Sequence, residues 1–248
     1  MLAYQTFGSG PSLLIAHGLY GSGRNWGVIA KRLSDRFRVI TVDMRNHGVS
    51  PWFDSHSYPE LASDLAEVLR VEGPAHVIGH SMGGKASMVL ALTHPELVHS
   101  LIVADIAPVA YTHTQIQFIE AMRGVDLSLV EKRSDALPLL GDIDPAVAPF
   151  LLQSLDVAGG KWRLNLDTLA RDMPLILGFP EVSGRFDGPT LFLSGATSDY
   201  VRPEHRALIK PLFPEAKFAK IPGAGHWLHA EKPREFEAAV RVFLLDDA

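Results

Sequence analysis

Short apolar runs alternate with longer segments whose apolar residues recur every three or four positions, up to about residue 106. Compact apolar runs are typical of buried strands, and the longer period is typical of helices that bury one face. The predicted strands cover residues 12–16, 38–43, 75–78 and 98–104, and the predicted helices cover residues 25–33, 58–70 and 85–92. Strands alternating with helices form right-handed crossovers, so this region predicts a mostly parallel sheet flanked by helices.

The alternation stops at Pro108. From there to about Gly188 the pattern indicates only helical or irregular segments, interrupted by proline and glycine. Strand-like runs then return, and a helix closes the chain. The later elements are predicted strands at residues 190–194 and 217–221 and a helix at residues 234–245.

This interruption divides the chain into two predicted parts. Residues 1–107 and 189–248 form an α/β core, and residues 108–188 form a helical lid inserted between two of its strands. Open α/β sheets bind their ligands at the carboxyl ends of the strands. We therefore expect the lid to cover that edge of the sheet.

Composition narrows the possible functions. The chain has 248 residues, of which 47% are hydrophobic and 21% are charged, as in an ordinary globular protein. Its net charge of −5 argues against a nucleic-acid partner, because no basic face is implied. The lack of cysteine excludes disulfides and thiolate catalysis. No histidine pair has zinc-site spacing, and no phosphate- or dinucleotide-binding glycine motif is present. We therefore expect neither a metal nor a cofactor.

The amino-terminal residues lack the basic and apolar regions of a signal peptide. No apolar run approaches the ~18 residues that a membrane-spanning helix needs. We therefore expect a cytoplasmic protein without stable membrane insertion. The sequence leaves the oligomeric state open.

One short motif joins a predicted strand to a predicted helix. Residues 79–83 have the form Gly-x-Ser-x-Gly. In this setting the motif predicts a nucleophile elbow, a sharp turn that holds a serine hydroxyl above the edge of a sheet. A side chain at Gly79 or Gly83 would collide with the packed strand and helix, and the serine would adopt a strained backbone conformation. Ser81 is the predicted nucleophile.

A serine hydroxyl needs a base to take its proton and a carboxylate to orient that base. His226 lies in a glycine-rich loop before the last helix and is the predicted base. Two residues are candidates for the acid. Asp105 ends the strand before the lid, where a lone charge among apolar residues is costly unless it has a partner. Asp199 follows the strand after the lid, where it can also be a turn residue.

Acyl transfer also requires donors for the negative charge that develops on the carbonyl oxygen. We expect these donors to be the backbone N–H groups of Met82, directly after the nucleophile, and Leu19, in the loop after the first predicted strand. His17 precedes that loop and is expected to shape it rather than act as a second base. His17, Trp162 and Trp227 are candidates for contact with the substrate.

The predicted lid carries apolar residues that either line an acyl pocket or pack the lid against the core. They are Phe118, Ile119, Met122, Phe150, Leu151, Trp162, Leu175, Ile176 and Phe179. The pattern alone does not separate the two roles, so the length of the acyl chain stays open.

These motifs together resemble the α/β-hydrolase superfamily and, more narrowly, the YbfF-like esterases, which include the abhydrolase-domain protein 11 group. The matching stretches are residues 17–22, 43–50, 80–85, 105–108 and 223–227. In most hydrolases the acid follows the strand after the lid; here Ser198 stands at that place and Asp199 comes one residue late. Several hydrolase branches, the haloalkane dehalogenases among them, carry their acid at the end of the strand before the lid. The resemblance to the YbfF-like esterases also implies Asp105, because in that family the Asp-Ile-Ala-Pro segment, here residues 105–108, carries the acid.

The resemblance implies a carboxylesterase-type serine hydrolase that cleaves esters of small to medium acyl chains. A serine at the elbow argues against haloalkane dehalogenase and epoxide hydrolase chemistry, which use an aspartate there. An acyl-coenzyme A or other acyl thioesterase is the alternative, because it uses the same three residues. A ligand-binding protein without catalytic activity is a further alternative, since the fold alone does not define the function.

Overall fold

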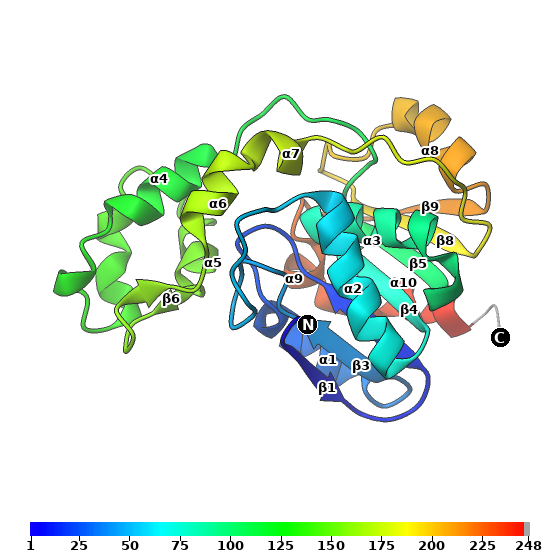
Figure 1. The fold of residues 1–248 in the computed structure, drawn as a ribbon, viewed down its shortest axis with the longest axis horizontal. Coiled ribbons are helices and arrows are strands. Elements are labelled where there is room, and N and C mark those ends of the chain that lie inside the picture. The colour runs from blue at the N-terminus through cyan, green and yellow to red at the C-terminus, as the bar shows by residue number, and fades with distance from the viewer. Residues whose placement is uncertain (246–248) are drawn as a thin grey trace.

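The computed structural model describes residues 1–245, which form a seven-stranded sheet with helices on both faces (Figure 1). The strands are β1 (Tyr4–Phe7), β2 (Ser12–Ala16), β3 (Arg38–Val42), β4 (Ala75–His80), β5 (Val98–Ala104), β8 (Thr190–Gly195) and β9 (Ala216–Ile221). Their order across the sheet is β1-β3-β2-β4-β5-β8-β9, with only β1 antiparallel to its neighbour. The mostly parallel sheet predicted from the alternating pattern is confirmed.

Within residues 1–245, the α-helices outside the insertion are α1 (Gly27–Leu33), α2 (Tyr58–Glu72), α3 (Met82–Thr93), α8 (Arg206–Leu212), α9 (Leu228–Glu231) and α10 (Pro233–Leu245). Four of these six helices, α1, α2, α3 and α10, lie close to predicted positions. Three elements of the core were not predicted: β1, α8 and α9. The residues of β1 are half-buried or exposed, so this edge strand lacks the apolar run that marks the buried strands.

Side chains on the two faces of the sheet enter two separate hydrophobic clusters. Along β2, Leu13 and Ile15 pack in the cluster that contains residues of α1 and α10, while Leu14 packs in the cluster that contains residues of α2 and α3. This alternation follows from the two-residue period of a strand. The nearly continuous apolar sequence of β2 is therefore explained by burial on both faces.

The insertion between β5 and β8 contains α4 (Ile116–Gly124), α5 (Ala148–Leu152), α6 (Leu166–Arg171) and α7 (Met173–Leu177). It lies beside the sheet, at the left of Figure 1. It also contains an antiparallel pair, β6 (Leu155–Asp156) and β7 (Lys161–Trp162). The expectation of only helical and irregular segments here is wrong, because two-residue strands are too short to produce an alternating pattern.

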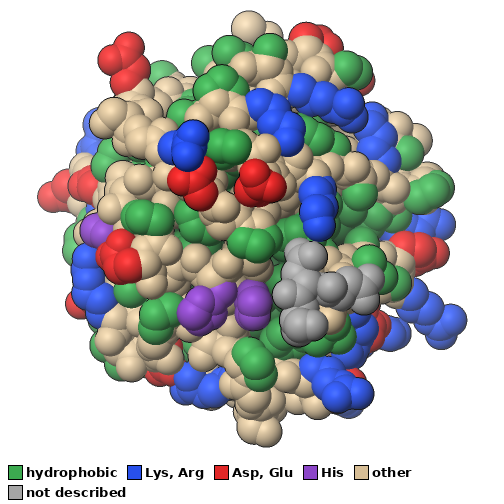
Figure 2. Space-filling model, turned by 90° about the vertical axis from the view of Figure 1, so that its right-hand side faces the viewer, with side chains coloured by type: hydrophobic (Ala, Val, Ile, Leu, Met, Phe, Trp, Pro, Cys, Tyr) green, Lys and Arg blue, Asp and Glu red, His purple; other side chains and the backbone are tan. Residues whose placement is uncertain are grey.

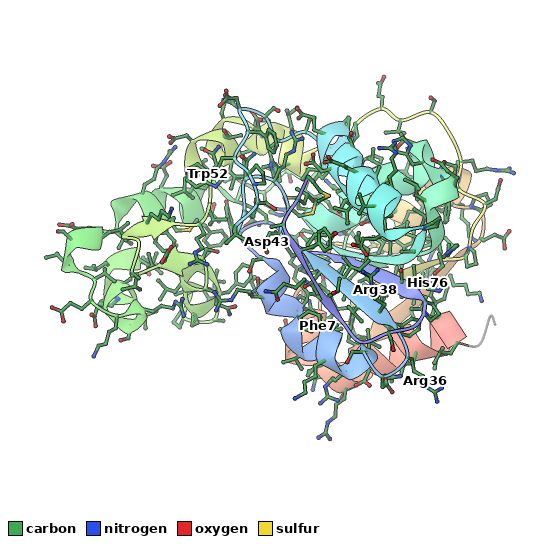
Figure 3. All side chains as sticks on the ribbon, turned by 60° about the horizontal axis from the view of Figure 1, so that its bottom comes forward. Phe7, Arg36, Arg38, Asp43, Trp52 and His76 are labelled. Atoms are coloured by element: carbon green, nitrogen blue, oxygen red, sulfur yellow. The ribbon has the colours of Figure 1, made fainter. Side chains whose placement is uncertain are left out.

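The insertion faces the carboxyl ends of the parallel strands. In Figure 3, Asp43, which follows β3, and Trp52 lie toward the insertion, whereas Arg36 and His76 lie toward the opposite end of the sheet. On the face at the right of Figure 1, basic and acidic side chains are interspersed (Figure 2), as on an ordinary solvated surface. Within residues 1–245, no helix has both the length and the apolar character needed to cross a bilayer.

Candidate active site

Ser81 occupies the sharp turn between β4 and α3. Its backbone angles, φ 52° and ψ −119°, are rare for a residue with a side chain and indicate local strain. A Cβ atom added at Gly79 would lie 2.4 Å from the carbonyl oxygen of Gly83, and one added at Gly83 would lie 2.4 Å from that of Ala16. Both contacts are impossible, so the elbow requires glycine at these two positions, as predicted.

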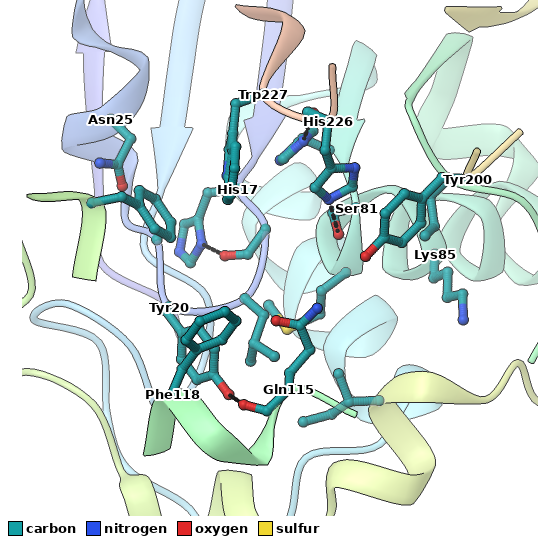
Figure 4. A pocket seen from close by; sticks show the side chains of 18 of the residues that line it. His17, Tyr20, Asn25, Ser81, Lys85, Gln115, Phe118, Tyr200, His226 and Trp227 are labelled. Carbon is teal, nitrogen blue, oxygen red and sulfur yellow. Dashed lines mark hydrogen bonds between the residues drawn. The ribbon is translucent and has the colours of Figure 1, made fainter. Parts of the chain in front are cut away.

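Three side chains from distant parts of the chain meet at this turn. His226 Nε2 lies 3.0 Å from Ser81 Oγ (Figure 4), and His226 Nδ1 lies 2.7 Å from Asp105 Oδ2. The Asp105 side chain is fully buried, whereas that of His226 is 19% exposed. One ring nitrogen therefore faces a buried carboxylate while the other faces the serine hydroxyl.

Asp105 reaches His226 because of its place in the sheet and its backbone. It follows β5 directly, has a φ of 53°, and donates its N–H to Leu193 of the neighbouring strand. Asp199, the alternative acid, is exposed, and its backbone carbonyl accepts a hydrogen bond from Arg202 Nε. The structure therefore brings Asp105, and not Asp199, to the histidine. The one-residue displacement of Asp199 relative to Ser198 has turned its side chain outward.

The loop after β2 approaches Ser81 closely. A Cβ atom added at Gly18 would lie 3.2 Å from Ser81 Cβ. The next residue, Leu19, and Met82 after the serine both line the cavity in front of Ser81. Neither backbone N–H donates to an acceptor within residues 1–245. Both amides are free to bind a negatively charged oxygen.

His17 holds this loop in place through hydrogen bonds at both of its ring nitrogens. Its Nδ1 donates to the carbonyl of Gly18, and its Nε2 accepts the backbone N–H of Met44 at 2.9 Å. Burial lowers the pKa of His17 to about 4, so the ring is neutral at pH 7. Although His17 lines the cavity, both of its ring nitrogens have partners in the protein. These contacts fit the predicted loop-shaping role better than direct polar contact with a substrate.

A second buried histidine holds the same loop. His47 Nε2 accepts the backbone N–H of Tyr20 at 3.2 Å, and its Nδ1 donates to the carbonyl of Arg45. Tyr20 has a φ of 64°, which is uncommon for a non-glycine residue. Desolvation lowers the pKa of His47 to about 3, so it acts here as a neutral acceptor.

In front of Ser81 lies a cavity of about 260 Å³ between the core and the insertion (Figure 4). Its wall is mostly apolar and aromatic. The apolar lining includes Leu19, Tyr20, Tyr58, Met82, Ile106, Tyr111, Phe118, Val147, Phe150, Leu151, Ile176, Leu177, Tyr200 and Trp227. Such a wall suits an aliphatic chain more than a charged group.

Only some of the apolar residues that were expected to contact a substrate line this cavity. Trp227 lines it, but Trp162 does not: its side chain is buried in β7, where it pairs with Leu155. The β6–β7 pair, which was not predicted, thus places Trp162 in the packing of the insertion, and its contact with the substrate stays a prediction. Of the nine apolar residues of the insertion that the sequence analysis singled out, four line the cavity: Phe118, Phe150, Leu151 and Ile176.

Lys85 is a buried lysine on α3, the helix that follows Ser81. Its side chain donates to the carbonyl oxygens of Leu177, at 2.9 Å, and Gly178, at 2.5 Å, at the end of α7. Burial lowers the pKa of its ammonium group to about 7. Lys85 therefore ties the elbow helix to the segment that returns from the insertion.

Sequence reasoning missed three residues that hold the site together. His80 Nε2 donates to the backbone carbonyl of His226, the ring of Tyr200 stacks on the ring of His226 with centroids 4.1 Å apart, and Ser198 binds Asp105. Only Ser198 had a recognisable signal, since it stands where most hydrolases carry the acid. Within residues 1–245, no three His, Cys, Asp or Glu side chains are arranged to hold a metal ion.

Comparison with known proteins identifies the family. A sequence model described as the alpha/beta hydrolase family matches residues 13–239, from β2 into α10. The chain belongs to this family. The match confirms the predicted α/β-hydrolase fold and covers the elbow, the aspartate after β5 and the histidine loop.

Relatives narrow the assignment to esterases and lipases. The chain is 42% identical to the sn-1-specific diacylglycerol lipase ABHD11 of Mus musculus, over 94% of this chain and 81% of the mouse protein. It is 38% identical to esterase YbfF of Escherichia coli K12, over 94% and 93% of the two chains. A marine microorganism esterase superposes with a TM-score of 0.93 at 40% identity, covering 98% of this chain and 99% of that one. The predicted resemblance to YbfF-like esterases is confirmed, and the chain is a carboxylesterase-type hydrolase.

Proposed function

We propose that this α/β-hydrolase cleaves carboxylic esters of small to medium acyl chains through a covalent acyl-enzyme on Ser81. In this proposal His226 is the general base and Asp105 is the acid that orients it. The observation that carries the proposal is the continuous hydrogen-bonded line from Asp105 Oδ2 through the imidazole of His226 to Ser81 Oγ. This is the arrangement in which a serine hydroxyl can lose its proton as it attacks a carbonyl carbon.

The first half of the cycle forms the acyl-enzyme. Ser81 Oγ attacks the ester carbonyl carbon while His226 Nε2 accepts the hydroxyl proton. The carbonyl oxygen becomes an oxyanion that accepts hydrogen bonds from the N–H groups of Leu19 and Met82. When the tetrahedral intermediate collapses, the bond to the leaving oxygen breaks and His226 returns the proton to it, releasing the alcohol.

The second half repeats these steps with water. His226 Nε2 takes a proton from a water molecule, whose oxygen attacks the acyl carbon, and the oxyanion again binds the same two amides. Collapse breaks the bond to Ser81 Oγ, which regains its proton from His226, and the carboxylic acid leaves. Asp105 stays ionised throughout, because its role is to hold the ring and to stabilise the imidazolium that forms twice in each cycle.

The wall of the cavity supports an apolar acyl group as substrate. A volume of about 260 Å³ lies slightly below the usual range of about 300–1,000 Å³ for small-molecule sites. We therefore expect short and medium chains to fit better than long ones. The names of the mouse and E. coli relatives, a diacylglycerol lipase and an esterase, also support an ester as substrate.

The proposal is tested by hydrolysis of p-nitrophenyl acetate, butyrate, octanoate and palmitate, with butyryl-coenzyme A measured beside them. The wild type and Ser81→Ala are compared, and Ser9→Ala, which alters an exposed serine after β1, is the matched control. We expect Ser81-dependent turnover, with the highest kcat/KM at butyrate or octanoate. A higher kcat/KM for the thioester would instead identify a thioesterase. Hydrolysis that survives Ser81→Ala, or no hydrolysis at all, contradicts the proposal.

A further inference from the structure

Among residues 1–245, two amide side chains line the catalytic cavity, and their hydrogen bonding differs. The amide of Asn25 is bound at both ends: its Oδ1 accepts the backbone N–H of Ser22 at 2.6 Å, and its Nδ2 donates to Gln153 Oε1 at 2.5 Å. The second amide belongs to Gln115, which directly precedes α4 at the start of the insertion. Asn25 is thus committed to protein partners, and Gln115 is not bound in this way.

Hydroxyl groups of the cavity wall are also committed to the protein. The hydroxyl of Tyr58 donates to the carbonyl of Ile176 at 2.5 Å, and that of Tyr111 donates to the carbonyl of Tyr200 at 2.7 Å. These groups can bind a substrate only by losing a bond to the protein, which is unfavourable for a buried polar group.

The Gln115 amide keeps most of its hydrogen-bonding capacity. In the part of the chain that the structure describes, its one polar contact is with the hydroxyl of Tyr200. Burial raises the pKa of that phenol, and the contact with Gln115 acts in the opposite direction. A side-chain amide has two N–H donors and a carbonyl oxygen with two lone pairs. Three of these four positions are therefore open to a ligand.

The backbone of Gln115 is held beside the loop that carries the proposed oxyanion donor Leu19. The hydroxyl of Tyr20, the residue after Leu19, donates to the carbonyl of Gln115 at 2.8 Å. The ring of Tyr20 also packs edge-on against Phe118, with centroids 6.1 Å apart. In Figure 4 the amide of Gln115 points from the insertion into the cavity, toward the side where Ser81 lies. The amide thus has a defined place in the same cavity as the serine.

We propose that Gln115 is a specificity-determining residue that binds a hydroxyl group of the substrate, on the acyl or the alcohol part of the ester. The proposal rests on the proposed function, because it concerns esters that Ser81 cleaves. A hydroxyl can donate to the Gln115 carbonyl and accept from its N–H. The amide is neutral and stands in a mostly apolar wall, which disfavours a charged group. Hydroxy esters are therefore better substrates than the matching alkyl esters.

Matched esters test for this hydroxyl. Ethyl butyrate is compared with ethyl 3-hydroxybutyrate, which carries a hydroxyl on the acyl part, and with 2-hydroxyethyl butyrate, which carries it on the alcohol part. Acid release is followed in a pH-stat, and kcat/KM for each hydroxy ester is divided by kcat/KM for ethyl butyrate. The ester whose ratio depends on Gln115 identifies the half of the substrate that reaches the amide.

Variants separate recognition from the intrinsic reactivity of the esters. Gln115→Leu replaces the amide by an apolar side chain of similar size. Losing a neutral hydrogen bond predicts a fall of about 3- to 10-fold in one of the two ratios. Gln117→Leu makes the same change at an exposed position of α4 that does not line the cavity, and we expect it to keep both wild-type ratios. Unchanged ratios in Gln115→Leu, or an equal fall in Gln117→Leu, overturn the proposal.

Failure of the proposed function gives a different result. Ser81→Ala would then still hydrolyse the three esters, or the wild type would hydrolyse none of them, and both proposals would fall. Hydrolysis that depends on Ser81 but shows no change of ratio in Gln115→Leu overturns only the role of Gln115.

Discussion

His80 Nε2 lies 2.8 Å from the backbone carbonyl oxygen of His226, so the residue before Ser81 holds the loop that carries the proposed base. Burial lowers the pKa of His80 well below its usual value, which keeps the ring neutral with a single ring N–H. The elbow therefore fixes the position of Ser81 and, through His80, also the position of the backbone of His226.

This contact predicts that His80→Phe lowers kcat about tenfold while KM changes by less than about two-fold, because a neutral hydrogen bond is lost and the backbone carbonyl of His226 is left without this donor. Phenylalanine keeps a ring in the buried site. His76→Phe, on the same strand but with its side chain bonded to Ser100, is the matched control. Steady-state kinetics on p-nitrophenyl butyrate provide the measurement. Equal effects of the two substitutions would indicate general disturbance of β4 instead.

Asp105→Asn is expected to lower kcat by about 10⁴, because the neutral amide no longer stabilises the imidazolium or fixes the tautomer of His226. Asp199→Asn makes the same chemical change at an exposed position, where we expect a difference within about two-fold. The two variants are compared in kcat at pH 8 after circular dichroism has established that each is folded. The reverse order of effects would restore Asp199 as the acid.

Lys85→Met predicts a looser connection between the core and the insertion. Methionine fills a similar volume but cannot donate to the carbonyls of Leu177 and Gly178, which are left without the lysine donor. We expect faster limited proteolysis in the segment after α7, with cleavage sites read by mass spectrometry. Lys31→Met, at an exposed position on α1, is the control and is expected to be cleaved like the wild type. Equal cleavage rates for Lys85→Met and the wild type would contradict the role of Lys85 as a tie.

His229 predicts a pH dependence of stability. It is buried, its ring stacks on Trp26 with centroids 4.0 Å apart, and desolvation lowers its pKa to about 3. As the pH falls below 6.5, His229 binds a proton in the unfolded chain but stays neutral in the folded chain. The free energy of unfolding therefore falls as the pH falls.

The measurement compares urea unfolding of the wild type and His229→Phe at pH 7 and pH 5. Because the variant lacks this proton uptake, its stability relative to the wild type is expected to rise by about 2 kcal/mol between the two pH values. An unchanged difference would mean that His229 titrates alike in the folded and unfolded states.

Local patterns were sufficient to predict the sheet and the elbow. Each central strand is a buried apolar run, and the elbow glycines are fixed by contacts within their own turn and with the adjacent strand. The edge strand β1 and the β6–β7 pair were not predicted, because short or half-exposed strands leave no clear apolar pattern in the sequence.

The choice between the two candidate acids could not be made from residue types alone. It depends on the pairing of β5 with β8 and on the backbone angle at Asp105, which together carry the side chain to a histidine 121 residues away. The contacts of His80 and Ser198 could not be predicted from the sequence for a similar reason. Their partners lie 146 and 93 residues away in the sequence, and only the folded loops bring them together.

Covalent labelling of the nucleophile tests the central claim most directly. The wild type, Ser81→Ala and His226→Ala are incubated with a p-nitrophenyl alkylphosphonate, followed by intact-mass measurement and peptide mapping. We predict one adduct on Ser81 of the wild type, formed in parallel with loss of esterase activity, much slower labelling of His226→Ala, and none of Ser81→Ala. An adduct at another residue, or full esterase activity after Ser81 is labelled, would contradict the account.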